Sequence, residues 1–140
     1  MVFYMHDQLM GAKPTALPVA MHKNVTALDF GTITVIDDVV TEGIERDSEQ
    51  VGQAQGIYAN SALDGTDIHL LFSIIFTNKK YNGSTLEIQG TERWTLKQRE
   101  VSVVSGTGVF RFARGYANLE TTYSSGLNAI GKFNATLLHY

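Results

Sequence analysis

Short runs of alternating apolar and polar residues, separated by turn residues, dominate this chain. In the clearest run, Leu86 and Ile88 alternate with Glu87 and Gln89. Such alternation is typical of a β-strand with one buried face. The same reading predicts strands near residues 2–7, 31–38, 51–60, 68–77, 85–89, 99–104, 109–117, 120–123 and 130–140. No stretch keeps a helical period, so the pattern predicts an all-β sandwich or barrel.

Carboxylates end the apolar face of two predicted strands. Asp7 follows Phe3 and Met5 on one face, and Asp37 takes the same place in the strand over residues 31–38. Aspartate is rarely buried unless it is paired, so an inward face with acids favours a barrel with a cavity over a dry sandwich. A barrel of about eight strands suits a chain of this length.

The neighbouring aspartate, Asp38, is expected to face solvent. A register error of one residue would exchange it with Asp37, because successive side chains of a strand point to opposite faces.

The segment VVSGTGVFRFARGYA, residues 103–117, contains the most unusual predicted strand. After the Gly-Thr-Gly turn, alternation places Phe110, Phe112, Arg114 and Tyr116 on one face. Burying an unpaired charge is costly, so an arginine on an apolar face needs a carboxylate partner or a polar ligand. Both alternatives stay open for Arg114.

Composition narrows the function classes. The 140 residues predict a single domain, 1–140, and the net charge of −3 disfavours nucleic acid as a partner. The longest apolar run, residues 70–76, is too short to cross a bilayer, which predicts no membrane partner. Cysteine is absent and the four histidines are scattered, so we expect no disulfide, no thiolate catalysis and no metal site.

Three sequons favour a secreted protein. Their asparagines, the candidate glycosylation sites, are Asn24, Asn82 and Asn134. No signal peptide precedes the first strand-like segment, which we interpret as a trimmed chain rather than a cytoplasmic precursor.

An ordered set of motifs covers nearly the whole chain: FYMHD, PTA, DDVVTEG, VGQAQGIY, FTNKKYNGSTLEIQG, REVSVVSGTGVFRFARGYA and a terminal HY. Together they resemble the plant dirigent and dirigent-like family. The resemblance implies an eight-stranded antiparallel β-barrel of the allene oxide cyclase-like kind, a homotrimer, and secretion to the cell-wall space, or apoplast.

The resemblance also implies chemistry without a redox centre or other cofactor. Dirigent proteins steer the stereoselective coupling of phenoxy radicals, as in lignan-type phenylpropanoid biosynthesis, after a separate laccase or peroxidase has oxidised the phenol. A dirigent-like branch instead dehydrates isoflavanols to pterocarpans. Both routes pass through a quinone methide. A third hypothesis is a non-catalytic cell-wall protein that binds phenolics or sugars.

The family motifs imply roles for particular residues. Asp7 and Asp37 are expected to act as acids toward a quinone methide, and Arg114 is expected to hold a phenolate or pair with an acid. The candidate substrate-binding aromatics are Tyr58, Tyr81 and Phe112. Structural alternatives stay open for all of them: strand-end acids that accept backbone N–H groups, a buried structural ion pair, and aromatic packing.

Overall fold

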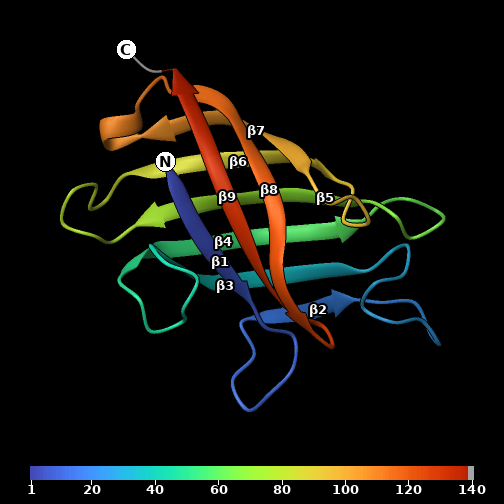
Figure 1. Cartoon of the computed structure of the whole chain (residues 1–140). Helices are drawn as coiled ribbons and strands as arrows, with labels where there is room; N and C mark the ends of the chain where they lie inside the picture. Colours follow the sequence, from blue (N-terminus) through green and yellow to red (C-terminus); the bar gives the residue numbers. More distant parts are fainter. Residues whose placement is uncertain (139–140) are drawn as a thin grey trace.

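The structure, a computed structural model, describes residues 1–138. Its regular secondary structure is almost entirely β-strand (Figure 1). These are β1 (Val2–Asp7), β2 (Ala16–Ala20), β3 (Ile33–Thr41), β4 (Gln50–Asn60), β5 (Ile68–Phe76), β6 (Thr85–Glu92), β7 (Arg99–Thr107), β8 (Arg114–Ser125) and β9 (Asn128–Leu138), with one 3-10 turn, η1 (Gly108–Phe110), between β7 and β8. The terminal His139 and Tyr140 of the HY motif lie outside the described residues.

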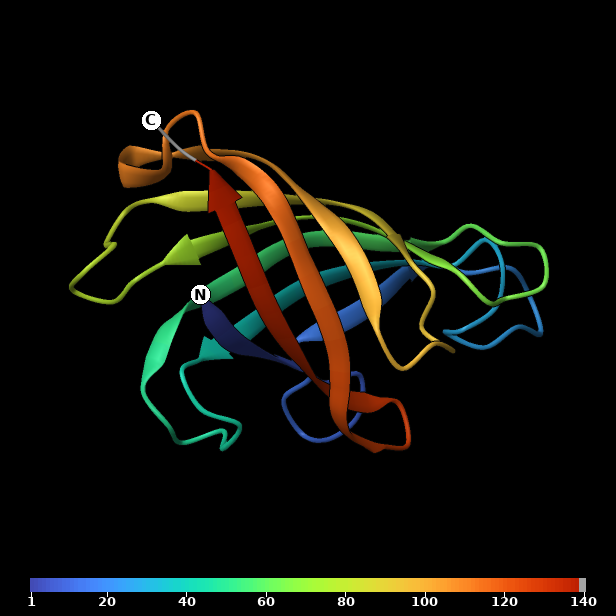
Figure 2. The same cartoon turned by 45° about the horizontal axis from the view of Figure 1, so that its top comes forward.

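The sheet closes into a barrel because one strand has two partners along the same edge. Strand β3 pairs with β2 through Ile36 and Ala16, and further along with β1 through Val40 and Met5. Strand β1 also pairs with β9, and all pairings are antiparallel. Eight strands therefore form the closed ring, and β2 extends the edge next to β1 (Figures 1 and 2). The predicted fold class, an eight-stranded antiparallel β-barrel, is confirmed.

Aromatic and aliphatic side chains fill much of the barrel interior. Phe3 of β1 stacks on Phe133 of β9 with ring centroids 5.4 Å apart, and Phe72 of β5 meets Phe133 edge-on at 6.2 Å. Each is at least 96% buried, and burial of one such ring contributes about 3 kcal/mol. These contacts join strands that are distant in sequence and hold the barrel closed.

Strand β3 presents the opposite face from the one predicted. Thr34, Ile36 and Asp38 point inward and are buried, whereas Val35 and Asp37 are exposed. The expectation that Asp37 lies on the inner face is therefore wrong. The apolar pattern misleads here because β3 has an exposed apolar outer face, while polar side chains of the same strand point into the barrel.

Residues 108–114 form a corner instead of the predicted strand. Gly108, with φ of 62°, turns the chain into η1, and β8 begins only at Arg114. Of the four side chains expected to share one face, Phe110 is buried, whereas Phe112 is 71% exposed and Arg114 is exposed as well. The predicted inward orientation of Phe112 and Arg114 is wrong, because the corner breaks the alternation on which it was based.

Candidate functional site

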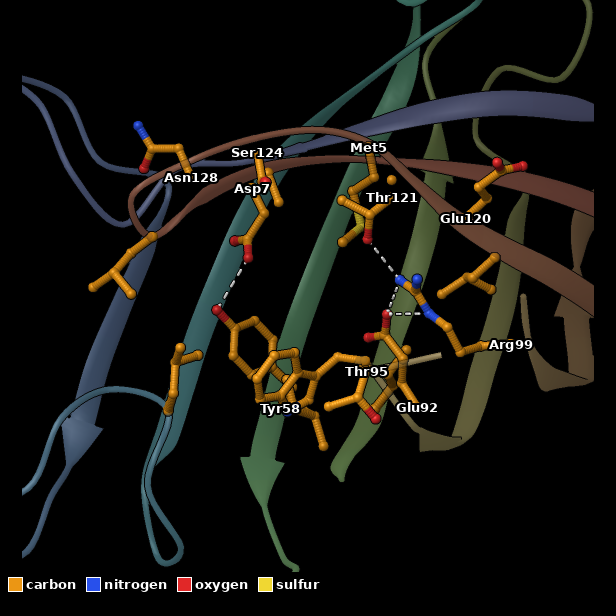
Figure 3. Close-up of a pocket in the computed structure, with 18 of the residues that line it drawn as sticks. Met5, Asp7, Tyr58, Glu92, Thr95, Arg99, Glu120, Thr121, Ser124 and Asn128 are labelled. Carbon is orange, nitrogen blue, oxygen red and sulfur yellow. Dashed lines mark hydrogen bonds and ion pairs between the residues drawn. The ribbon is translucent and has the colours of Figure 1, made fainter. Parts of the chain in front are cut away.

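A cavity of about 550 Å³ lies inside the barrel. Its walls are largely apolar and include Met5, Leu70 and Phe133. Two polar clusters interrupt them, and Figure 3 shows the members that line the cavity: Asp7 with Tyr58, and Arg99 with Glu92 and Thr121. We name them the acid cluster and the ion-pair cluster. A cavity of this size, with few polar groups in an apolar lining, is typical of a small-molecule site.

The acid cluster joins residues of three strands and one loop: Asp7 of β1, Asp38 of β3, Tyr58 of β4, and Thr15 just before β2. The Tyr58 hydroxyl donates to Asp7 Oδ2 at 3.1 Å, and the Thr15 hydroxyl donates to Asp38 Oδ1 at 2.6 Å. The other two carboxyl oxygens, Asp7 Oδ1 and Asp38 Oδ2, are buried and have no hydrogen-bond partner among residues 1–138. Asp7 and Tyr58 line the cavity, and Asp38 lies beyond its lining.

The carboxyl groups of this cluster are tuned to hold a proton. Burial raises the pKa of Asp7 to about 6, and hydrogen bonds to the carboxylate limit the rise. Burial also raises the pKa of Asp38, and the neighbouring Asp7 charge raises it further. Because each ionisation opposes the other, the pair retains one proton near neutral pH. Burial raises the pKa of Tyr58 as well, so its hydroxyl stays a donor.

Asp38→Asn is expected to stabilise the fold in a pH-dependent way. The pKa of Asp38 is higher in the folded protein than in the unfolded chain. In wild type, the free energy of unfolding therefore falls as pH rises above about 4, because the unfolded chain loses this proton more readily than the folded protein does. Asparagine does not titrate, can still accept from Thr15, and supplies an N–H donor to the pair. We expect a gain of roughly 2–4 kcal/mol at pH 7 and little difference at pH 4, measured by urea unfolding.

The comparison with wild type isolates this effect. His6, whose pKa is lowered chiefly by burial, titrates in both proteins and cancels in the difference. An equal shift in stability at pH 4 and pH 7 contradicts the assignment of a proton to Asp38.

The ion-pair cluster centres on Arg99 at the start of β7. Its Nη2 lies 2.6 Å from Glu92 Oε1 and donates to Thr121 Oγ1 at 2.9 Å, while Nη1 donates to the Leu96 carbonyl at 3.1 Å. The Arg99 and Glu92 side chains are only 5% and 14% exposed. Arg99 is thus a buried cation at the cavity wall, fixed by an acid, a hydroxyl and a carbonyl.

Sequence reasoning missed this cation. Arg99 has the same parity as Val101 and Val103, the buried face of β7. An arginine in phase with that apolar face carried the signal that we assigned to Arg114 instead.

The structure brings together only part of the predicted site. Asp7 and Tyr58 lie in the cavity, hydrogen-bonded to each other. Asp37 lies outside the barrel, where its carboxylate accepts from Gln55 Nε2 at 3.1 Å. Its place is taken by Asp38, the residue that a one-residue change of register brings inward. The catalytic role of the acids stays a prediction.

The other predicted side chains lie away from this cavity. Tyr81 packs on Phe76 and Phe110, with ring centroids 5.4 and 5.0 Å away, and does not line the cavity. Phe112 and Arg114 project from the corner into solvent. The asparagines of the three sequons are all exposed: Asn24, Asn82 and Asn134.

Across residues 1–138, no three His, Asp or Glu side chains converge in a way that could hold a metal ion. In the same residues, no helix has the length and hydropathy to span a bilayer.

Fold and cavity together define a class: an eight-stranded antiparallel β-barrel with a largely apolar cavity and buried carboxyl groups beside it. Comparison with known proteins agrees with this class. A family model described as Dirigent-like protein matches residues 1–138. The chain belongs to the dirigent family.

Curated relatives and solved structures show the same relationship. Dirigent protein 1 of Arabidopsis thaliana is 42% identical over 98% of this chain and 76% of its own length. Pterocarpan synthase 1 of Glycine max is 37% identical over 99% of this chain and 77% of its own. The structure of the pterocarpan synthase dirigent protein PsPTS1 superposes with a TM-score of 0.94 at 37% identity, covering 100% of this chain and 94% of that one.

Proposed function

We propose that this protein binds a phenolic alcohol in its cavity and closes a ring through a quinone methide, with the acid cluster as proton donor. The observation that carries the proposal is the buried Asp7–Asp38 pair, hydrogen-bonded to Tyr58 at the wall of an apolar cavity. A carboxyl group with a raised pKa is suited to general-acid catalysis near neutral pH. The similarity to pterocarpan synthases supports the same choice, with an isoflavanol as substrate.

The proposed reaction balances without an oxidant. Asp38 passes the proton of the pair to Asp7, and Asp7 gives it to the departing hydroxyl, so that the C–O bond breaks and water leaves. The phenolic O–H gives its proton back to the carboxylate, which forms the quinone methide. A second hydroxyl of the substrate then adds to the methide carbon, and its proton passes to the carbonyl oxygen. The net change is the loss of one water, and the protein needs no cofactor for it.

A second candidate is stereoselective coupling of two phenoxy radicals. The two polar clusters lie on different parts of one cavity wall (Figure 3), and a cavity of about 550 Å³ has room for two phenylpropanoid units. One cluster would then orient each phenol. This candidate requires a separate laccase or peroxidase to remove the electrons.

Two assays separate the candidates. We expect an isoflavanol, offered without an oxidant, to give a pterocarpan at a rate that depends on Asp7. Coniferyl alcohol with a one-electron oxidant tests the second candidate, which requires an enantiomeric excess on chiral chromatography. Ligand binding with neither product overturns both and favours a non-catalytic phenolic- or sugar-binding protein.

We also propose that the protein is a homotrimer, as the family resemblance implies. Support comes from an apolar row on the outer face, where Leu17, Val35, Ile57 and Leu71 pair in register across four strands. Leu17 and Leu71 are 61% and 52% exposed, and exposed apolar patches commonly mark interfaces. Sedimentation equilibrium of wild type should give three times the monomer mass, and the Leu71→Lys variant should give the mass of a single monomer. A wild-type monomer contradicts the proposal.

Secretion to the plant cell wall and N-glycosylation complete the proposal. The exposure of all three sequon asparagines supports it, because a folded chain leaves them room for glycans. A mass loss after enzymatic deglycosylation of the plant-produced protein tests it.

A further inference from the structure

The loop before β2 places Thr15 against the acid cluster. Its main chain is fixed on both sides: the Thr15 N–H donates to the Gln8 carbonyl at 2.8 Å, and the Thr15 carbonyl accepts from the Asp37 N–H at 2.8 Å. Its hydroxyl oxygen accepts from the Gln8 N–H at 3.1 Å. This threonine belongs to the PTA motif, which the proposed chemistry does not otherwise use.

The hydroxyl of Thr15 has one proton and two acceptors within reach. Asp38 Oδ1 lies 2.6 Å away and the His6 carbonyl 3.4 Å away, so the proton points to Asp38. An oxygen that accepts this hydrogen bond is not the one that carries the acid proton. The remaining oxygen of that carboxyl group, Oδ2, is buried and has no hydrogen-bond partner in the described part of the chain, and the same holds for Oδ1 of Asp7.

We propose that Thr15 is a positioning residue that directs the proton of the acid pair to Oδ2 of Asp38. A proton there serves both unpartnered oxygens, because Asp38 Oδ2 donates and Asp7 Oδ1 accepts. Asp7 thereby keeps Oδ2 for Tyr58 and receives on Oδ1 the proton that it gives to the departing hydroxyl. Only the catalytic consequence depends on the proposed function; the location of the proton does not.

Matched substitutions isolate the hydroxyl. Thr15→Val removes the donor at nearly constant shape, Thr15→Ser restores it, and Thr32→Val deletes another buried hydroxyl, which donates to the Thr26 carbonyl away from the acid cluster. The other charges acting on the pair, Glu92 and Asp37, are unchanged in all three variants.

The test is a carbon-13 NMR titration of the aspartate carboxyl groups, which needs no substrate. Loss of a hydrogen bond to the charged form should raise the upper titration of the pair by about one pH unit in Thr15→Val. Thr15→Ser and Thr32→Val should titrate like wild type. An unchanged titration in Thr15→Val overturns the proposal.

Two further measurements keep the outcome decisive. The first uses wild type, so it can be made even if Thr15→Val does not fold. The Thr15 hydroxyl proton should exchange slowly with solvent, and its chemical shift should change as Asp38 titrates. A chemical shift that does not change with this titration overturns the proposal. If the protein is active, the upper limb of the kcat/KM profile should move with the NMR titration in Thr15→Val and return in Thr15→Ser. Absence of turnover in wild type overturns the proposed function, and the titration still decides the role of Thr15.

Discussion

Asp7→Asn should lower turnover by about 10²- to 10⁴-fold while the barrel stays folded. Asparagine still accepts from the Tyr58 hydroxyl through its carbonyl oxygen, so the packing at the cavity wall is retained. It has no proton to give to a departing hydroxyl, and its presence leaves Asp38 without an ionisable partner. The loss should therefore appear in kcat more than in KM, because the substrate contacts are almost unchanged.

A carboxylate on the other face of β3 provides the control for this substitution. Asp37→Asn makes the same chemical change outside the barrel, where the Asp37 carboxylate accepts a hydrogen bond from Gln55. It should keep the wild-type rate within about twofold, since its charge acts on the pair only from a distance. Asp38→Asn should behave like Asp7→Asn. A loss of turnover in Asp37→Asn with normal activity in Asp38→Asn contradicts the assignment of the inner face.

The fold could be predicted because most strands have one apolar face and one polar face. In β5 the inward residues Leu70, Phe72 and Ile74 alternate with less buried ones, and β6 repeats the pattern with Leu86 and Ile88. The prediction that the sheet closes into a barrel came from the acids on inward faces, which favour a cavity, and not from the periodicity of the strands. The motifs that resemble the dirigent family then supplied the number of strands.

The site could be predicted only in part, because periodicity identifies two faces without saying which is inside. In β3 the outer face is the apolar one, since Val35 belongs to the exposed row with Leu17 and Leu71. A strand with an exposed apolar outer face cannot be distinguished from sequence alone from a strand that buries its apolar face in the core. Asp37 was chosen over Asp38 for this reason.

The orientation of the side chains at residues 108–114 was predicted wrongly for a different reason. Alternation was extended through a glycine turn whose geometry moves the chain out of the strand. Arg99, by contrast, stands at a strand start in phase with buried valines, and its partner Glu92 ends the preceding strand. Two opposite charges that flank one connection between antiparallel strands are a signal that sequence reading can use.

Arg99→Ala should destabilise the protein by about 3–5 kcal/mol, the largest loss of stability that we expect from one substitution at the cavity. Truncation leaves Glu92 largely buried without its cation and removes the donors to Thr121 and to the Leu96 carbonyl. Urea unfolding at pH 7 measures the loss. Arg99→Lys should recover only part of it, because one ammonium group does not reach all three acceptors.

Replacing both partners distinguishes a structural ion pair from a substrate contact. In Arg99→Met with Glu92→Leu, two apolar side chains of similar volume remove the desolvation cost together with the attraction, so stability should return to within about 1 kcal/mol of wild type. If this double variant is stable and active, the pair serves the fold alone. If it is stable but loses product selectivity, the guanidinium orients the substrate opposite the acid cluster. A loss below about 1 kcal/mol in Arg99→Ala means that water already solvates Glu92, and it refutes the buried pair.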